Sequence, residues 1–182
     1  MLSREEALGL VHNYLKKKNL VKHVLAVESI MKALAERFGE DPHLWSIAGL
    51  LHDLDYEVTF EAPERHGYVT LDYLEGLDVP ESVRNAILAH TGHVARTSLL
   101  DKAMYCSDPV TGLIVASALL HPTKSLAGVD AGFVGNRFKE KRFAAGANRE
   151  AIASCRDMGL ELHDFLEISI AAMKQIAQEL EL

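Results

Sequence analysis

The amino-acid sequence predicts an all-α protein. Apolar residues recur at intervals of three and four positions over most of the 182-residue chain, which is the spacing of one helix face. Residues that cap helix N-termini precede several of these runs, and the apolar–polar alternation of strands is nearly absent. No repeat, low-complexity segment or linker divides the chain, so we expect a single domain over residues 1–182.

The first two helices are marked by their ends and by their apolar spacing. Ser3 with Glu6 three residues later forms a capping box, and the helix that it opens runs to the lysines at 16–18. The second helix ends at Gly39, and its apolar stripe consists of Leu20, Val24, Val27, Met31, Leu34 and Phe38.

The third helix should be the buried centre of the fold. Asp41 caps it, and Pro42 occupies the first position, where a missing N–H costs nothing. Apolar residues surround the whole helix rather than one face, which is typical of a buried helix. Gly49, one turn before Asp53, would let another backbone approach closely.

The middle of the chain contains shorter elements. Residues 55–64 resemble an acidic loop, and helices are expected over about 65–74 and from Pro80 to near Gly92. Ser98 and Asp101 cap a long helical stretch that we expect to be interrupted at Asp108-Pro109.

The C-terminal part continues the helical pattern. Loops with short helices are expected over 122–147, and Asn148 caps a helix that ends at Gly159. The last helix carries one apolar stripe from Leu162 to Leu180.

Composition limits the class of protein. Apolar residues make up 48% and charged residues 25%, which argues against disorder, and the net charge of −7 disfavours polymeric nucleic acid and anionic membranes as partners. Cys106 and Cys155 have no paired spacing, which favours a reducing compartment. No long apolar run accompanies the charged N-terminus, so we expect a cytoplasmic protein with no membrane segment.

The centre of interest is His52-Asp53, at the end of the most buried helix. A carboxylate beside an imidazole is costly there unless a partner compensates it. A divalent cation would do so, because carboxylates and neutral imidazoles are its ordinary ligands. The alternative is a helix-terminal histidine followed by an aspartate that begins a loop.

Other helices place similar groups on inward faces. His23 shares a face with Val27 and Ile30, His90 completes a stripe with Val83 and Ile87, and Asp108 follows Leu100 and Met104. Each alone is more often a core histidine or a capping aspartate. Together these groups indicate helices that converge on a buried cation site.

The pattern His23, His52-Asp53, Asp108 resembles the signature of the HD superfamily of metal-dependent phosphohydrolases. Segments 86–91 and 100–108 resemble the branch with HD-type diadenosine tetraphosphate hydrolases, and segments 111–116 and 143–146 are similar to a little-characterised group of predicted HD hydrolases. The resemblance implies an HD-domain helical bundle over about 20–120 with a C-terminal helical extension over about 121–182. Many relatives follow the doublet with a small residue, glycine and lysine, whereas this chain has Leu54-Asp55-Tyr56-Glu57.

The resemblance also implies the site. One divalent transition ion would be held by His23, His52, Asp53 and Asp108, and Asp53 would bridge to a second ion on His66 and His90. Asp53 and His52 are the positions expected to be catalytic. Nitrogen and oxygen ligands together favour manganese, iron, cobalt, nickel or zinc. Such ions would activate a water to hydroxide that attacks a phosphate ester or a nucleotide phosphate.

Three further sets of residues bear on the chemistry of the site. Lys139 and Arg142 belong to a basic segment, 136–149, that is either a solvated helix face or a lid that binds substrate phosphate. Asp55, Glu57, Glu61 and Glu64 could supply a general acid, although most should solvate an exposed loop. His93 is excluded as a ligand, because Gly92 should end the helix before it.

Two rival functions remain open at this point. HD proteins with two irons include oxygenases that cleave carbon bonds, and their ligands are much the same. A binding module could instead have kept the metals and lost catalysis, and it would bind a nucleotide without turnover. The sequence determines neither the substrate, the metal nor the oligomeric state.

Overall fold

The computed structural model describes residues 1–182 as helices joined by short connections, with no strand, which confirms the predicted all-α class. In chain order the elements are α1 (Arg4–Tyr14), α2 (Lys18–Phe38), α3 (Pro42–Leu51), α4 (Tyr56–Thr59), η1 (Pro63–Arg65), α5 (Tyr68–Tyr73), α6 (Glu81–Thr91), α7 (Leu99–Leu120), η2 (Leu126–Gly128), α8 (Ala131–Lys139), α9 (Arg149–Ala153), η3 (Ser154–Met158), α10 (Leu162–Gln175) and α11 (Ala177–Leu180).

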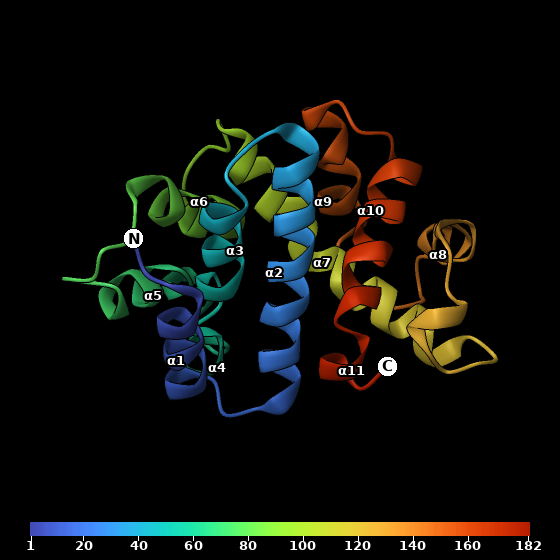
Figure 1. The fold of residues 1–182 in the computed structure, drawn as a ribbon, viewed down its shortest axis with the longest axis horizontal. Coiled ribbons are helices and arrows are strands. Elements are labelled where there is room, and N and C mark those ends of the chain that lie inside the picture. Colours follow the sequence, from blue (N-terminus) through green and yellow to red (C-terminus); the bar gives the residue numbers. More distant parts are fainter.

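Helix α2 stands at the centre of the molecule, between α3 and α10, and α7 crosses behind it (Figure 1). Helix α6 packs against both α3 and α7. Helices α2, α3, α6 and α7 therefore enclose one region. The buried apolar side chains form one cluster that includes residues from α1 at one end of the chain and from α11 at the other.

Helix α3 is buried along its length, as its apolar composition predicts. Every residue from Trp45 to Leu51 is buried. Gly49 permits the close packing, because a Cβ atom there would lie 2.7 Å from the Glu28 Cα of α2. The predicted caps at Ser3, Asp41 and Gly39 are all present.

The predicted interruption at Asp108-Pro109 is wrong, because the 22-residue helix α7 continues without a break through Pro109. A proline inside a helix removes one backbone hydrogen bond and costs about 3 kcal/mol. Buried neighbours on both sides of the proline, including Met104 and Val110, supply packing that offsets this cost. By length and composition α7 could cross a membrane, but 56% of its most apolar window is buried as a core helix.

The stretch after α3 is more ordered than the predicted loop. Residues 55–64 contain α4 and η1, and the helix expected from about 65 begins only at Tyr68. Gly67 has a φ of +84°, and this turn in the backbone places the start of the helix after it. His66 consequently lies between η1 and α5, with its backbone in an extended conformation.

Candidate metal centre

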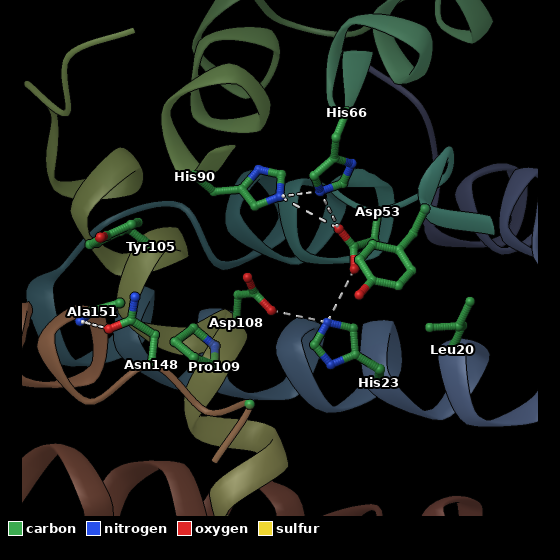
Figure 2. A pocket seen from close by; sticks show the side chains of 12 residues that line it. Leu20, His23, Asp53, His66, His90, Tyr105, Asp108, Pro109, Asn148 and Ala151 are labelled. Carbon is green, nitrogen blue, oxygen red and sulfur yellow. Dashed lines mark hydrogen bonds and ion pairs between the residues drawn. The ribbon is translucent and has the colours of Figure 1, made fainter. Parts of the chain in front are cut away.

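All six predicted ligands meet at one point (Figure 2). His23 comes from α2, His52 caps α3, His90 belongs to α6 and Asp108 to α7. Asp53 follows the α3 cap, and His66 lies in the turn before α5. The six ligands divide into two groups that could each hold an ion: His23, His52, Asp53 and Asp108, and then Asp53, His66 and His90.

Asp53 belongs to both groups, and both of its carboxylate oxygens face histidines. Its Oδ2 lies 3.4 Å from His23 Nε2. Its Oδ1 lies 3.2 Å from His66 Nε2 and 3.5 Å from the Nε2 atoms of His52 and His90. Asp108 Oδ1 completes the first group at 3.2 Å from His23 Nε2. A carboxylate placed in this way is suited to bridging two ions.

The four histidines share one orientation. Each Nδ1–H donates to a protein acceptor: His52 to the Gly49 carbonyl at 2.9 Å, His90 to the Ile87 carbonyl at 2.6 Å, and His66 to Asp55 Oδ1 at 2.7 Å. His23 Nδ1 donates at 3.0 Å to the hydroxyl oxygen of Thr111, whose own proton goes to the Asp108 carbonyl. Every Nε2 is therefore left to face the centre, as metal-binding histidines require.

His52 Nε2 provides a direct test of whether a metal fits. This nitrogen is completely buried and has no hydrogen-bond partner. Burial lowers the pKa of His52 to about 4, so the ring is neutral and its Nε2 carries a lone pair. An unpartnered buried acceptor is costly in a folded protein. A cation between His52 and Asp53 would satisfy it, so the residues present fit a metal.

In the metal-free site, the two carboxylates hold protons on two of the histidines. Burial opposes protonation of His23, but Asp108 and Asp53 outweigh it and raise its pKa to about 10. Asp53 and Asp55 similarly raise the pKa of His66 to about 10 against its burial. The pKa values of Asp53 and Asp108 fall despite burial, because the histidines favour the charged carboxylates.

Asp55 is a residue of the site that sequence reasoning assigned to a solvated loop. Its side chain is fully buried and accepts three hydrogen bonds, from His66 Nδ1–H and from the backbone N–H groups of Gly67 at 2.8 Å and Thr70 at 3.0 Å. Asp55 thus fixes both the orientation of His66 and the start of α5. Its position two residues after Asp53 is the only signal that the sequence carried.

His93 lies outside both groups of candidate ligands, but it contacts one of their members. Its Nε2–H donates to the His66 carbonyl at 2.8 Å, and its ring lies 4.4 Å from that of Tyr68. His66 is therefore held at both its side chain and its backbone.

A cavity of about 370 Å³ opens onto the centre. Besides five of the ligands, its walls are Leu20, Tyr56, Tyr105, Pro109, Gly146, Asn148 and Ala151. Figure 2 shows Asn148, Pro109 and Tyr105 on the side of Asp108, with Leu20 beyond His23. No lysine or arginine lines this cavity.

The basic segment 136–149 contributes to this cavity through Gly146 and Asn148, while the exposed Lys139 and Arg142 do not line it. The substrate-binding role of these two residues stays a prediction. Arg149 stabilises the loop that precedes α9. Its guanidinium donates hydrogen bonds to backbone carbonyls of that loop, including those of Ala144 at 2.8 Å and Ala147 at 2.7 Å.

Comparison with known proteins agrees with this geometry. A family model described as HD domain matches residues 20–121. Ribonuclease Y 2 of Levilactobacillus brevis is 32% identical over 95 residues, which cover 52% of this chain and 18% of that protein. Ribonuclease Y of Aliarcobacter butzleri is 33% identical over 94 residues, with the same two shares.

A longer match reaches beyond the family model. Ribonuclease Y of Clostridium novyi is 25% identical over 170 residues, which cover 90% of this chain and 33% of that protein. The chain thus spans about a fifth to a third of the length of these curated relatives. No solved structure matches the chain.

Proposed function

The chain belongs to the HD domain family, and from this premise we propose that it is a metal-dependent phosphohydrolase acting on a small phosphate ester or nucleotide phosphate. The observation that carries the proposal is the shared orientation of the four histidines. Each Nδ1 is held by the protein, each Nε2 faces Asp53 or Asp108, and one Nε2 is buried without a partner.

We propose that His23, His52, Asp53 and Asp108 hold one divalent ion and that Asp53, His66 and His90 hold another. Divalent ions lower the pKa of a bound water and neutralise charge on phosphoryl oxygens. Manganese, iron, cobalt, nickel and zinc suit this mixture of nitrogen and oxygen ligands.

The carboxylates of Asp53 and Asp108 would supply negative charge that balances the bound cations. Asn148 offers an amide at the mouth of the cavity. No serine or cysteine is required, and both cysteines are buried with raised pKa values, that of Cys155 to about 11.

A second candidate is cleavage of RNA, because the relatives reported above are named as ribonucleases. The net charge of −7 and the lack of lysine and arginine side chains in the metal-centre cavity favour a small substrate over a polyanion. We also propose a cytoplasmic location, for which the reduced, buried cysteines are the support.

The test is a reconstitution experiment. Protein stripped of metal is loaded in turn with manganese, iron, cobalt, nickel or zinc and assayed with phosphate monoesters, nucleotides and an RNA oligonucleotide. We expect release of phosphate or a nucleotide with at least one metal. Oxygen consumption without phosphate release would favour an oxygenase, and tight nucleotide binding without turnover would favour a binding module.

Asp53→Asn tests the site itself. Asparagine keeps the size of the side chain but removes the charge that both ion groups share. We expect activity to fall by about a hundredfold or more and at least one metal to be lost, since even indirect partners of metal ligands are worth 10–100-fold. Asp72→Asn, at an exposed position on α5, is the control. Parent-like turnover of Asp53→Asn would overturn the mechanism.

A further inference from the structure

A second cavity of about 480 Å³ adjoins the metal centre. It is lined by Lys17, Lys18, Asn19, Leu20, Tyr56 and Phe60, and it is called here the aromatic–lysine groove. Leu20 and Tyr56 also line the metal-centre cavity, so the two spaces share a wall. A substrate whose phosphate lies at the metals could therefore extend its leaving group past these two side chains.

Two aromatic rings face solvent in this groove. Phe60 is 66% exposed and Tyr56 is 36% exposed. Their ring centroids lie 6.0 Å apart, and the Tyr56 ring lies 5.6 Å from that of the metal-site residue His66. Exposed rings beside a site are ready to stack on a planar group, because every such group presents a π-face.

The groove also carries free positive charge. Lys17 and Lys18 are exposed, and neither ammonium group forms an ion pair. The Glu57 carboxylate accepts hydrogen bonds from the backbone N–H groups of Lys16 and Lys17 at 2.7 Å each. This contact fixes the turn before α2 against α4, so the lysines are presented beside the rings.

The two lysines could neutralise substrate charge that lies outside the metal-centre cavity. In a substrate with more than one phosphate, one phosphate would lie at the metals, and the negative charge of the others would need a separate positive partner. Apart from the histidines of the metal centre, Lys17 and Lys18 are the only basic side chains that line either cavity. Lysine ammonium groups suit phosphate oxygens as point charges.

We propose that the aromatic–lysine groove binds the leaving group of the substrate, and that this group carries a planar aromatic ring together with a second anionic group. The ring would stack on Phe60 and Tyr56, and the anion would meet Lys17 and Lys18. This inference rests on the proposed phosphohydrolase function and adds the chemical class of its substrate.

Four substrates separate the contribution of the aromatic ring from that of the second anionic group. Glycerol 3-phosphate has neither a ring nor a second anion, p-nitrophenyl phosphate has a ring, tripolyphosphate has additional charge, and a nucleoside diphosphate has both. The nucleoside diphosphate should show the lowest KM of the four with metal-loaded parent protein.

Phe60→Ala should raise KM about tenfold for the two substrates with a ring and leave the other two unchanged, in line with the usual cost of losing one stacked aromatic ring. The double variant Lys17→Ala/Lys18→Ala should raise KM about tenfold for tripolyphosphate and the nucleoside diphosphate only. All three positions are exposed, so the variants should fold.

Matched controls come from the same kinds of position. Val58→Ala removes an apolar side chain of α4 that is 64% exposed and lines neither cavity. Lys32→Ala/Lys174→Ala removes the same charge from exposed positions outside the groove. Both controls should keep the parent KM values.

Direct binding separates failure of the groove from failure of the proposed function. If the parent hydrolyses none of the substrates, the proposed function fails. The groove is then tested by calorimetric titration, which measures the affinity of each variant for the nucleoside diphosphate. Weaker binding to the groove variants than to the controls would support it. Parent-like KM values and parent-like nucleotide affinity in both groove variants would overturn it.

Discussion

At the scale of single residues, the metal centre depends on which nitrogen of each histidine carries the proton. Backbone carbonyls accept the Nδ1–H of His52 and of His90 and so keep the proton on Nδ1, whereas the Nδ1–H of His66 donates to the buried carboxylate of Asp55. A carboxylate partner makes the imidazole more basic and a better ligand than a carbonyl partner does. The second ion group therefore depends on a residue that does not touch the ion.

Asp55→Asn should weaken the second metal about 10–100-fold and leave the first nearly unchanged. The amide group can keep one acceptor, but its N–H₂ would face either the His66 Nδ1–H or the backbone donors of Gly67 and Thr70. Calorimetric titration with a single metal would give both affinities. Equal loss at both ion groups would show general misfolding instead, and Asp72→Asn is the control.

Metal binding should release about two protons per chain at pH 7.5, because His23 and His66 have pKa values of about 10 in the metal-free site. Ordinary histidines would compete with metals only near pH 6.5. Calorimetry in buffers of different ionisation enthalpy counts these protons. A count near zero would contradict the assignment of either histidine as a ligand.

The same pKa shifts set the stability of the metal-free protein. Both folded-state pKa values lie above the unfolded reference of 6.5. Protonation therefore stabilises the fold fully below pH 6.5, and this contribution is lost as pH rises through about 10. The Tm of chelated protein should fall over that window.

At the scale of elements, α3 delivers His52 and Asp53 only because it lies directly against α2. Gly49 makes this possible, since a Cβ there would lie 2.7 Å from Glu28 Cα and 2.8 Å from Glu28 N. Both are backbone atoms, so no side chain can rotate away to make room. The carbonyl of Gly49 also accepts the His52 Nδ1–H, which links this packing to the metal site.

Gly49→Ala should lower the free energy of unfolding by about 1–3 kcal/mol through overpacking, and metal affinity should fall with it. Gly9→Ala is the matched control, because Gly9 also lies in a helix but has no atom within 4 Å of its added Cβ. It should raise stability by about 0.5–1 kcal/mol. Urea unfolding at unchanged m-value measures both, and a neutral Gly49→Ala would contradict the close approach.

At the scale of the whole molecule, the ligands join segments that are distant in the chain, from His23 to Asp108. Ions bound there would tie α2, α3, α6 and α7 together in the native state only. Binding to the native state alone stabilises it by mass action. Metal content and global stability should therefore change together.

Protein purified without chelator should contain close to two transition ions per chain by elemental analysis. At a metal concentration 100 times Kd, chelation should lower Tm by about 5–10 °C for each bound ion in a chain of this length. Asp53→Asn should lose most of this shift. One ion per chain, with full activity in a His66→Ala/His90→Ala variant, would reduce the site to a single ion.

The sequence by itself determined the elements and the primary ligands. Helical periodicity and caps such as Ser3, Asp41 and Gly39 are local signals, because the interactions behind them span only three or four residues. The inward faces of His23, His90 and Asp108 follow from the same periodicity. That is why the all-α class and the convergence of these helices could be predicted, whereas the role of His66 followed only from the resemblance to the HD superfamily.

Only the tertiary structure decided the rest. Asp55 is buried because α5 and the His66 turn fold over it, and the continuity of α7 through Pro109 depends on packing on both sides. Lys17 and Lys18 line the groove beside the metal-centre cavity because Glu57, 40 residues from Lys17, binds the backbone of their turn. Burial and hydrogen bonds between distant residues arise only when helices pack, so no local pattern encodes them.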